Sequence, residues 1–278
     1  MTGTVLAAVL CAALMHAGWN TMVKAKGEAF LSTVAVAASA GLLCALVLPF
    51  LPQPAPASWP YIAASSLAQV LYYALLMETY REGDISHAYP LMRGCAPLIV
   101  ALLALPFTGE RLGGVQWLAI GLICGGVLTM YAGVRKGAPN ARRTTLLALA
   151  TACVIAAYTL VDGIGVRKSG APAAYTMWIF LFTALGVVLM ARRRPGELLP
   201  FVRRHPLLLG GGAMSVASYG VALWAMTQAP VAVVAALRET SILFATALAL
   251  LALRERVGPL RLLGAVLIAC GAAAMRLA

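Results

Sequence analysis

The chain has 278 residues, of which 62% are hydrophobic and only 11% are charged, and its mean hydropathy is +0.90. A soluble domain would carry about 25% charged residues, so the composition excludes a soluble globular protein and indicates a membrane protein. The formal net charge of +12 does not indicate nucleic-acid binding. The basic residues lie in short connections between apolar runs, which is how membrane proteins mark their cytoplasmic side.

The apolar runs predict the helices, since a bilayer core about 30 Å thick is crossed by roughly 20 helical residues. We predict helices over 4–23, 30–51, 61–79, 85–107, 112–133, 144–166, 173–190, 207–227, 231–253 and 260–276. The fold class is therefore expected to be all-α and polytopic, with ten transmembrane helices. In the fifth of them, Gly121 and Gly125 form a small-xxx-small pattern, which predicts close helix packing.

The first predicted helix brings polar side chains into the apolar sequence. His16 and Asn20 are one turn apart and share a face, with Trp19 beside them. Polar groups next to an aromatic ring suit a small-molecule site, so all three are candidate substrate-binding residues. A lipid-facing Trp19 and an interhelical hydrogen bond from Asn20 are the simpler interpretations.

The fourth predicted helix holds Arg93 between Pro90 and Pro97. An arginine near the centre of a membrane helix costs about 2.5–3.5 kcal/mol on insertion scales, so it needs a partner or a polar cavity. We predict that Arg93 faces a central cavity, where its planar fork of donors binds an anionic group. The alternatives are a snorkelling position nearer the interface or a structural ion pair. Candidate partners for such a pair are Glu78, Asp84 and Asp162.

The sixth predicted helix repeats the polar face of the first. When the sequence is aligned with itself at an offset of 142 residues, Tyr158 aligns with His16 and Asp162 aligns with Asn20. Asp162 and Glu239 are the strongest candidates for an intramembrane carboxylate that takes up protons in a coupled cycle, with Glu78 as a third. A fixed counter-ion to an arginine is the alternative role. The remaining candidate lining residues are aromatic, and they are Tyr72, Tyr89, Tyr158, Tyr219 and Trp224.

The segment 80–126 recurs in 231–272. When the sequence is aligned with itself at an offset of 145 residues, Arg238 aligns with Arg93 and Glu255 aligns with Glu110. In both copies the glutamate lies 17 positions after the arginine. This predicts a duplication with repeats at 1–133 and 144–278 and a basic linker at 134–143. We expect Arg238 to share the role of Arg93, and the two glutamates to cap helix ends and anchor loops.

Repeats of five helices have a topological consequence. Five is odd, so the second repeat must enter the membrane in the opposite orientation, and inverted repeats with a site at their interface are typical of transporters. In the expected connections, 15 basic residues fall on one side and 4 on the other, these being Arg111, Arg167, Lys168 and Arg276. The richer side should be cytoplasmic, which places both termini outside the cytoplasm.

Other chemistries find no support in the sequence. The six cysteines lie singly in apolar runs without metal-ligand spacing. No nucleophile–base arrangement, phosphate-binding glycine loop or zinc motif appears. We therefore expect no enzyme, no metal, no cofactor and no nucleic-acid partner.

The run PLIVALLALPFTGERLGGVQWLAIGLICGGVL, residues 97–128, resembles the late part of an EamA-like repeat of the drug/metabolite transporter (DMT) superfamily. Residues 249–271, with RER in place of GER, resemble its second copy, and the motifs GDISHAYPLMRG and HAGWN are also similar to part of that family. The resemblance implies ten helices in inverted five-helix repeats. It also implies a central cavity lined mainly by helices one, three, four, six, eight and nine, and secondary transport, often metabolite export.

These observations together predict a secondary transporter in the plasma (cytoplasmic, inner) membrane, most simply an exporter that works by alternating access. The two intramembrane arginines disfavour a cationic drug and favour a small metabolite with a carboxylate, phosphate or phosphonate group. A flippase for a lipid-linked phosphate or sugar, a multidrug-type exporter and a non-transport scaffold are the alternatives. Proton coupling, and the choice between monomer and homodimer, are left open by the sequence.

Overall fold

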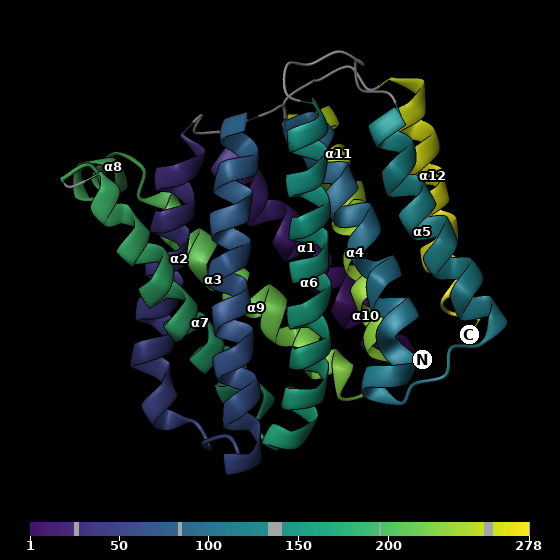
Figure 1. Cartoon of the computed structure of the whole chain (residues 1–278), viewed down its shortest axis with the longest axis horizontal. Coiled ribbons are helices and arrows are strands. Elements are labelled where there is room, and N and C mark those ends of the chain that lie inside the picture. Colours follow the sequence, from purple (N-terminus) through teal and green to yellow (C-terminus); the bar gives the residue numbers. More distant parts are fainter. Residues whose placement is uncertain (25–27, 83–84, 133–140, 195, 253–257, 278) are drawn as a thin grey trace.

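The computed structural model describes residues 1–24, 28–82, 85–132, 141–194, 196–252 and 258–277. All regular elements in these ranges are helices (Figure 1), so the all-α prediction is confirmed. In chain order they are α1 (Gly3–Lys24), α2 (Ala29–Val47), η1 (Leu48–Phe50), η2 (Pro56–Ser58), α3 (Trp59–Glu82), α4 (Ile85–Thr108), α5 (Gly114–Ala132), α6 (Ala141–Ser169), α7 (Pro172–Met190), η3 (Ala191–Arg193), α8 (Leu198–Arg204), α9 (Leu207–Met226), α10 (Val231–Arg238), α11 (Ser241–Ala252) and α12 (Pro259–Ala274).

Within the described ranges, seven helices are long and apolar enough to cross a membrane: those of α1, α2, α3, α4, α6, α7 and α9. The apolar helices α5 and α12 are shorter. The count of ten crossings therefore stays a prediction, although each predicted run is helical over most of its length.

The helix predicted over 231–253 is instead divided into α10 and α11. At the division, Thr240 N donates to Leu237 O (3.0 Å) and Thr240 Oγ1 donates to the same carbonyl (2.7 Å). A threonine hydroxyl that bonds a nearby carbonyl competes with the regular helical ladder. The division leaves Arg238 as the last residue of α10 and Glu239 at the turn. The short helix α8 was also not predicted.

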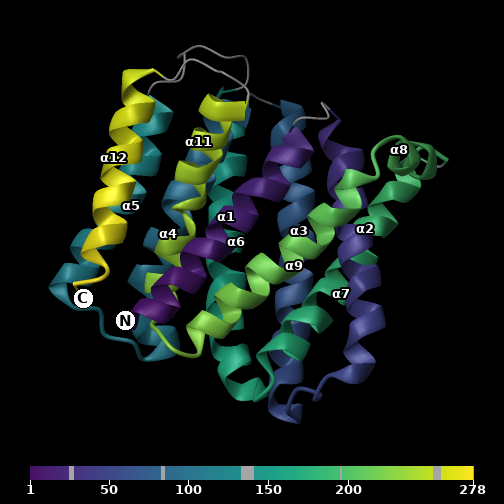
Figure 2. The same cartoon turned by 180° about the vertical axis from the view of Figure 1, so that it is seen from behind.

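The two halves of the chain pack in a symmetrical pattern. Helix α1 packs on α9 as α6 packs on α3, and α1 packs on α11 as α6 packs on α4. In two further contacts, a helix of the first half packs on the helix at the equivalent position of the second half. These pairs are α2 with α7 and α5 with α12, and the helices of each pair run side by side in Figures 1 and 2. Figure 1 also shows that α1 starts at the end of the bundle where α6 finishes. This pattern is the one expected of two related halves with opposite directions.

Glycines bring α5 and α12 into close contact, but they are not the glycines predicted. A Cβ on Gly126 would lie 2.7 Å from Gly264 O, and one on Gly271 would lie 2.8 Å from Ala119 O. A Cβ on Gly121 or Gly125 would meet nothing within 4 Å. The backbones of α5 and α12 therefore approach each other along the Gly126 face, as small residues allow in membrane helix pairs.

The two ends of the bundle differ in charge. One end, which we call the terminal end, holds both chain termini (lower right of Figure 1 and lower left of Figure 2). The connections 109–113, 170–171 and 227–230 lie at this end too. The opposite end, which we call the basic end, carries α8 and exposes Arg192, Arg194, Arg203 and Arg204.

Candidate functional site

A buried ion pair lies where α4 meets the division between α10 and α11. Arg93 Nε is 2.8 Å from Glu239 Oε2, and the two side chains are only 11% and 6% exposed. The Arg93 guanidinium also donates from Nη2 to Ser241 Oγ at 3.4 Å. Arg93 is therefore neutralised by a carboxylate from the other half of the chain. The sequence offered a structural ion pair as one interpretation of Arg93 and a counter-ion to an arginine as one interpretation of Glu239, but it did not name Glu239 as the partner of Arg93.

The second arginine, Arg238, has a different environment. Its Cζ lies 4.8 Å from the centre of the Tyr219 ring, over the ring face, where the π electrons attract a cation. Among the described residues, no carboxylate lies within ion-pair distance of Arg238. The two arginines occupy matching positions in the repeats, but within the described part of the chain only Arg93 is paired with a carboxylate.

Asp162 of α6 is fully buried and is held by two phenols. Tyr219 donates its hydroxyl to Oδ2 at 2.5 Å, and Tyr175 donates to Oδ1 at 3.2 Å. Each carboxylate oxygen thus has a donor, which a buried polar group requires. Tyr219 also connects this carboxylate with Arg238, because its hydroxyl binds Asp162 while its ring faces the guanidinium.

A row of aromatic rings joins α3, α6, α7 and α9 beside these charges. The ring centre of Tyr72 lies 5.1 Å from that of Tyr73 and 6.1 Å from that of Tyr158. The row continues from Tyr158 to Tyr219 at 6.5 Å and ends at Phe180, 6.0 Å further on. All four pairs meet edge to face, the arrangement that aromatic quadrupoles prefer. Three predicted lining residues, Tyr72, Tyr158 and Tyr219, are thus brought together.

The polar face of α1 lies against the same region, because α1 packs on α10 and α11. His16 and Trp19 meet edge to face with ring centres 5.3 Å apart, and Asn20 Nδ2 donates to His16 O at 2.8 Å. The Trp19 indole N–H is buried and has no hydrogen-bond partner among the described residues. Asn20 therefore bonds within its own helix, and Trp19 presents a free donor.

Two of the remaining predicted site residues, Glu78 and Trp224, lie apart from these contacts, while Tyr89 lies next to Arg93 on the same helix. Glu78 forms an ion pair with Arg143 at 3.2 Å, with side chains 34% and 59% exposed. Trp224 is 37% exposed near the end of α9. Tyr89 is partly buried one turn before Arg93 on α4. Asp84, considered as a partner of Arg93, lies outside the described residues.

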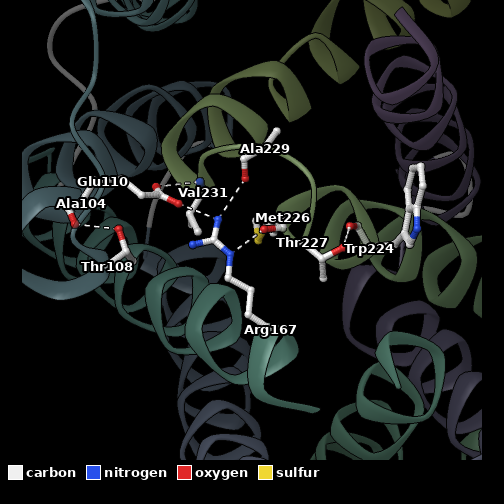
Figure 3. A network of polar contacts seen from close by, with 9 residues as sticks. All are labelled: Ala104, Thr108, Glu110, Arg167, Trp224, Met226, Thr227, Ala229 and Val231. Carbon is white, nitrogen blue, oxygen red and sulfur yellow. Dashed lines mark hydrogen bonds and ion pairs between the residues drawn. The ribbon is translucent and has the colours of Figure 1, made fainter. Parts of the chain in front are cut away.

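A second polar network at the terminal end joins the last turn of α6 to two connections, 109–113 and 227–230 (Figure 3). Arg167 donates from Nε to Met226 O (2.7 Å) and from Nη2 to Ala229 O (3.0 Å), and Nη2 also lies 2.5 Å from Glu110 Oε1. The other carboxylate oxygen of Glu110 accepts from Val231 N at 2.9 Å. Glu110 therefore caps α10 and anchors its own loop. The equivalent Glu255 and Arg256 lie outside the described residues.

The fold and the site define a class: a multi-pass helical membrane protein with charged residues buried between its two halves. The model of the EamA-like transporter family matches residues 3–132 and 142–277. The chain belongs to the EamA-like transporter family, which confirms the resemblance and makes it a membrane transporter of the DMT superfamily.

Comparison with solved structures gives the fold alone. A structure described as "Crystal structure of protein" superposes with a TM-score of 0.81, over 100% of this chain and 98% of that chain, at 20% sequence identity. No curated protein matches the sequence.

Proposed function

We propose that this protein is a secondary transporter that exports a small metabolite with a carboxylate, phosphate or phosphonate group across the plasma (inner) membrane. The observation that carries the proposal is Arg238, a partly buried guanidinium without a carboxylate partner among the described residues. An unpaired arginine inside a membrane protein is costly, and such residues mark substrate pathways. A guanidinium also binds carboxylates and phosphates through two parallel hydrogen bonds.

The other charges near the centre already have partners. Arg93 is paired with Glu239, and Asp162 accepts from two tyrosine hydroxyls. Arg238 is therefore the cation left for an anionic ligand, while the Tyr72–Tyr158–Tyr219 row offers apolar ring surface beside it. We propose that Trp19, with its free buried indole N–H, contributes a further donor from α1.

Alternating access is supported by the symmetrical packing of the two halves, with the charged centre between them. Export is the direction that the resemblance favours. The excess of basic residues at the basic end supports a cytoplasmic location for that end, with both termini outside. For proton coupling, Glu239 and Asp162 are the candidates that lie at the centre, because Glu78 is held in its pair with Arg143.

A thermal-shift screen tests the proposal on the purified wild type, Arg238→Gln and the control Arg203→Gln, which changes an exposed arginine of the basic end. The panel holds organic acids, amino acids, sugar phosphates, phosphonates, lipophilic cations and lipid-linked phosphates. We expect one anionic class to stabilise the wild type and Arg203→Gln but not Arg238→Gln. Proteoliposomes loaded with that class should then release it in a protein-dependent manner.

Other outcomes would point elsewhere. Equal stabilisation of all three proteins by lipophilic cations would favour a multidrug-type exporter. Stabilisation by lipid-linked phosphates alone would favour a flippase. An anionic class that still stabilises Arg238→Gln in full would remove Arg238 from the binding site.

A further inference from the structure

We propose that Glu110 and Arg167 form the gate at the terminal end of the transport path, and that this gate is closed in the present structure. The inference rests on the proposed transport function. It assigns a role to two charged residues that lie outside the central site and that take no part in the proposed binding of substrate.

The two residues join parts of the chain that must separate if the terminal end is to open. Glu110 comes from the connection between α4 and α5, and Arg167 from the last turn of α6. Their partners are Met226 O at the end of α9, Ala229 O in the next connection, and Val231 N at the start of α10. Figure 3 shows Arg167 extending from α6 toward these groups, with the Glu110 carboxylate beside its guanidinium.

The charges match the helix ends that they contact. A helix C-terminus presents free carbonyls and a partial negative charge, and a helix N-terminus presents free N–H groups and a partial positive charge. Arg167 donates to the last carbonyl of α9, and Glu110 accepts from the first N–H of α10. Charge-assisted hydrogen bonds of this kind are about twice as strong as neutral ones. The network is therefore specific for this arrangement of α6, α9 and α10.

Helix α10 connects the network directly with the central site. Glu110 binds its first residue, Val231, and its last residue is Arg238. The eight residues of α10 span about 12 Å at 1.5 Å per residue, and all from Val231 to Leu237 are buried. A short helix packed along its whole length moves as one piece. A displacement of its first turn therefore displaces Arg238 relative to Tyr219, so that opening the gate changes the site.

The chain offers a matched control at the other end. Glu28 and Arg194 form an ion pair at 3.2 Å near the basic end, with side chains 40% and 45% exposed. The pair has the same two residue types, but Glu28 binds no backbone N–H of another helix in the described residues. Glu28→Gln therefore removes a carboxylate without touching the proposed gate.

The test measures opening with a cysteine between the gate and the site. Ala235 of α10 is 7% exposed, so Ala235→Cys should react slowly with a membrane-impermeant maleimide in lipid nanodiscs. We expect Glu110→Gln and Arg167→Gln each to raise its labelling rate roughly tenfold, because each removes charged hydrogen bonds that favour the closed form. In the double variant Glu110→Gln/Arg167→Gln, the labelling rate should be only slightly higher than in the faster of the two single variants, since both residues act in one network. Glu28→Gln should leave the rate unchanged.

Native cysteines separate gate opening from loss of structure. Cys44 in α2 and Cys124 in α5 are both fully buried, and peptide mass spectrometry resolves their labelling from that of residue 235. Labelling confined to residue 235 supports a gate, whereas parallel labelling of Cys44 and Cys124 would show general unfolding and overturn it. Equal rates in Glu110→Gln, Arg167→Gln and Glu28→Gln would also overturn it.

The labelling needs no substrate, so its result is independent of the transport assay. A raised rate at residue 235 in a protein that moves no solute would leave the gate standing and contradict the proposed transport. Solute transport with unchanged labelling would leave the function standing and contradict the gate.

Discussion

Arg93 and Arg238 occupy the same position in the two copies of the duplicated segment, yet their surroundings differ. Arg93 contacts the carboxylate of Glu239 at 2.8 Å, while Arg238 lies over the ring of Tyr219. The duplication therefore preserves the side chain but not its partner. At this scale Arg93 belongs to the joint between the halves, and we propose Arg238 as the arginine that binds a ligand.

The Arg93–Glu239 pair should stabilise the fold chiefly because each residue neutralises a buried charge that would otherwise be left without a partner. Removing one partner of a buried pair costs about 3–5 kcal/mol, whereas replacing both costs much less. We expect Glu239→Gln to lower the free energy of unfolding by about this amount, and the double variant Arg93→Gln/Glu239→Gln to recover a large part of the loss. Unfolding in detergent, followed by tryptophan fluorescence, measures both. Equal losses in the single and double variants would contradict a direct pair.

Tyr219 has two separable roles, since its hydroxyl binds Asp162 and its ring faces Arg238. Tyr219→Phe removes only the hydroxyl, which should cost about 1–3 kcal/mol because a buried acceptor loses its donor, with anion binding retained. Tyr219→Leu removes the ring as well and should also weaken anion binding. Ligand titration of the two variants tests this; equal binding would show that the ring does not position Arg238.

At the scale of single elements, the sequence predicts the helices well and their interruptions poorly. Long apolar runs determine where a helix crosses the bilayer, so 85–107 and 173–190 fall within two residues of α4 and α7. The division of 231–253 could not be predicted in the same way, because the segment Arg238–Ser241 contains neither proline nor glycine. Helix α8 has only seven residues and is too short to stand out.

The side-chain contacts were harder to predict than the helices. The partner of Arg93 depends on the register between α4 and the α10–α11 division, which no local pattern encodes. Likewise, Gly121 and Gly125 satisfy the small-xxx-small pattern, but the orientation of α5 about its own axis places Gly126, not these two glycines, against α12.

The α5–α12 contact gives a prediction with a matched control one residue away. A methyl group on Gly126 would lie 2.7 Å from a backbone oxygen of α12, whereas one on Gly125 would meet nothing within 4 Å. Gly126→Ala should therefore lower stability by about 1–3 kcal/mol, the usual cost of overpacking, and Gly125→Ala should leave it nearly unchanged. Thermal unfolding in the same detergent compares them. Equal midpoints would contradict the close approach.

For the whole molecule, the paired contacts between the halves and the location of both termini at one end have the same cause. A chain whose second half repeats the first in the opposite direction must end on the side where it began (Figure 1). From the charge asymmetry we predict that this side faces away from the cytoplasm.

Epitope tags test that orientation. Tags at the N- and C-termini should both be removed by protease added to intact cells. A tag inserted after Gly196, an exposed residue at the basic end with a φ of 82°, should survive until the membrane is permeabilised. Termini that differ from each other would contradict an even number of crossings. Protection of both termini would reverse the orientation.

The pairing of Arg93 with Glu239 also has a consequence for how the protein is made. The ribosome completes Arg93 146 residues before it reaches Glu239, which takes about 7–30 s at typical rates of synthesis. During that interval α4 must enter the bilayer with a charge that has no final partner, and α1 and α5 wait for α9 and α12. The first half of the chain is thus held in the membrane as an unfinished structure, whose assembly is completed only when the second half arrives.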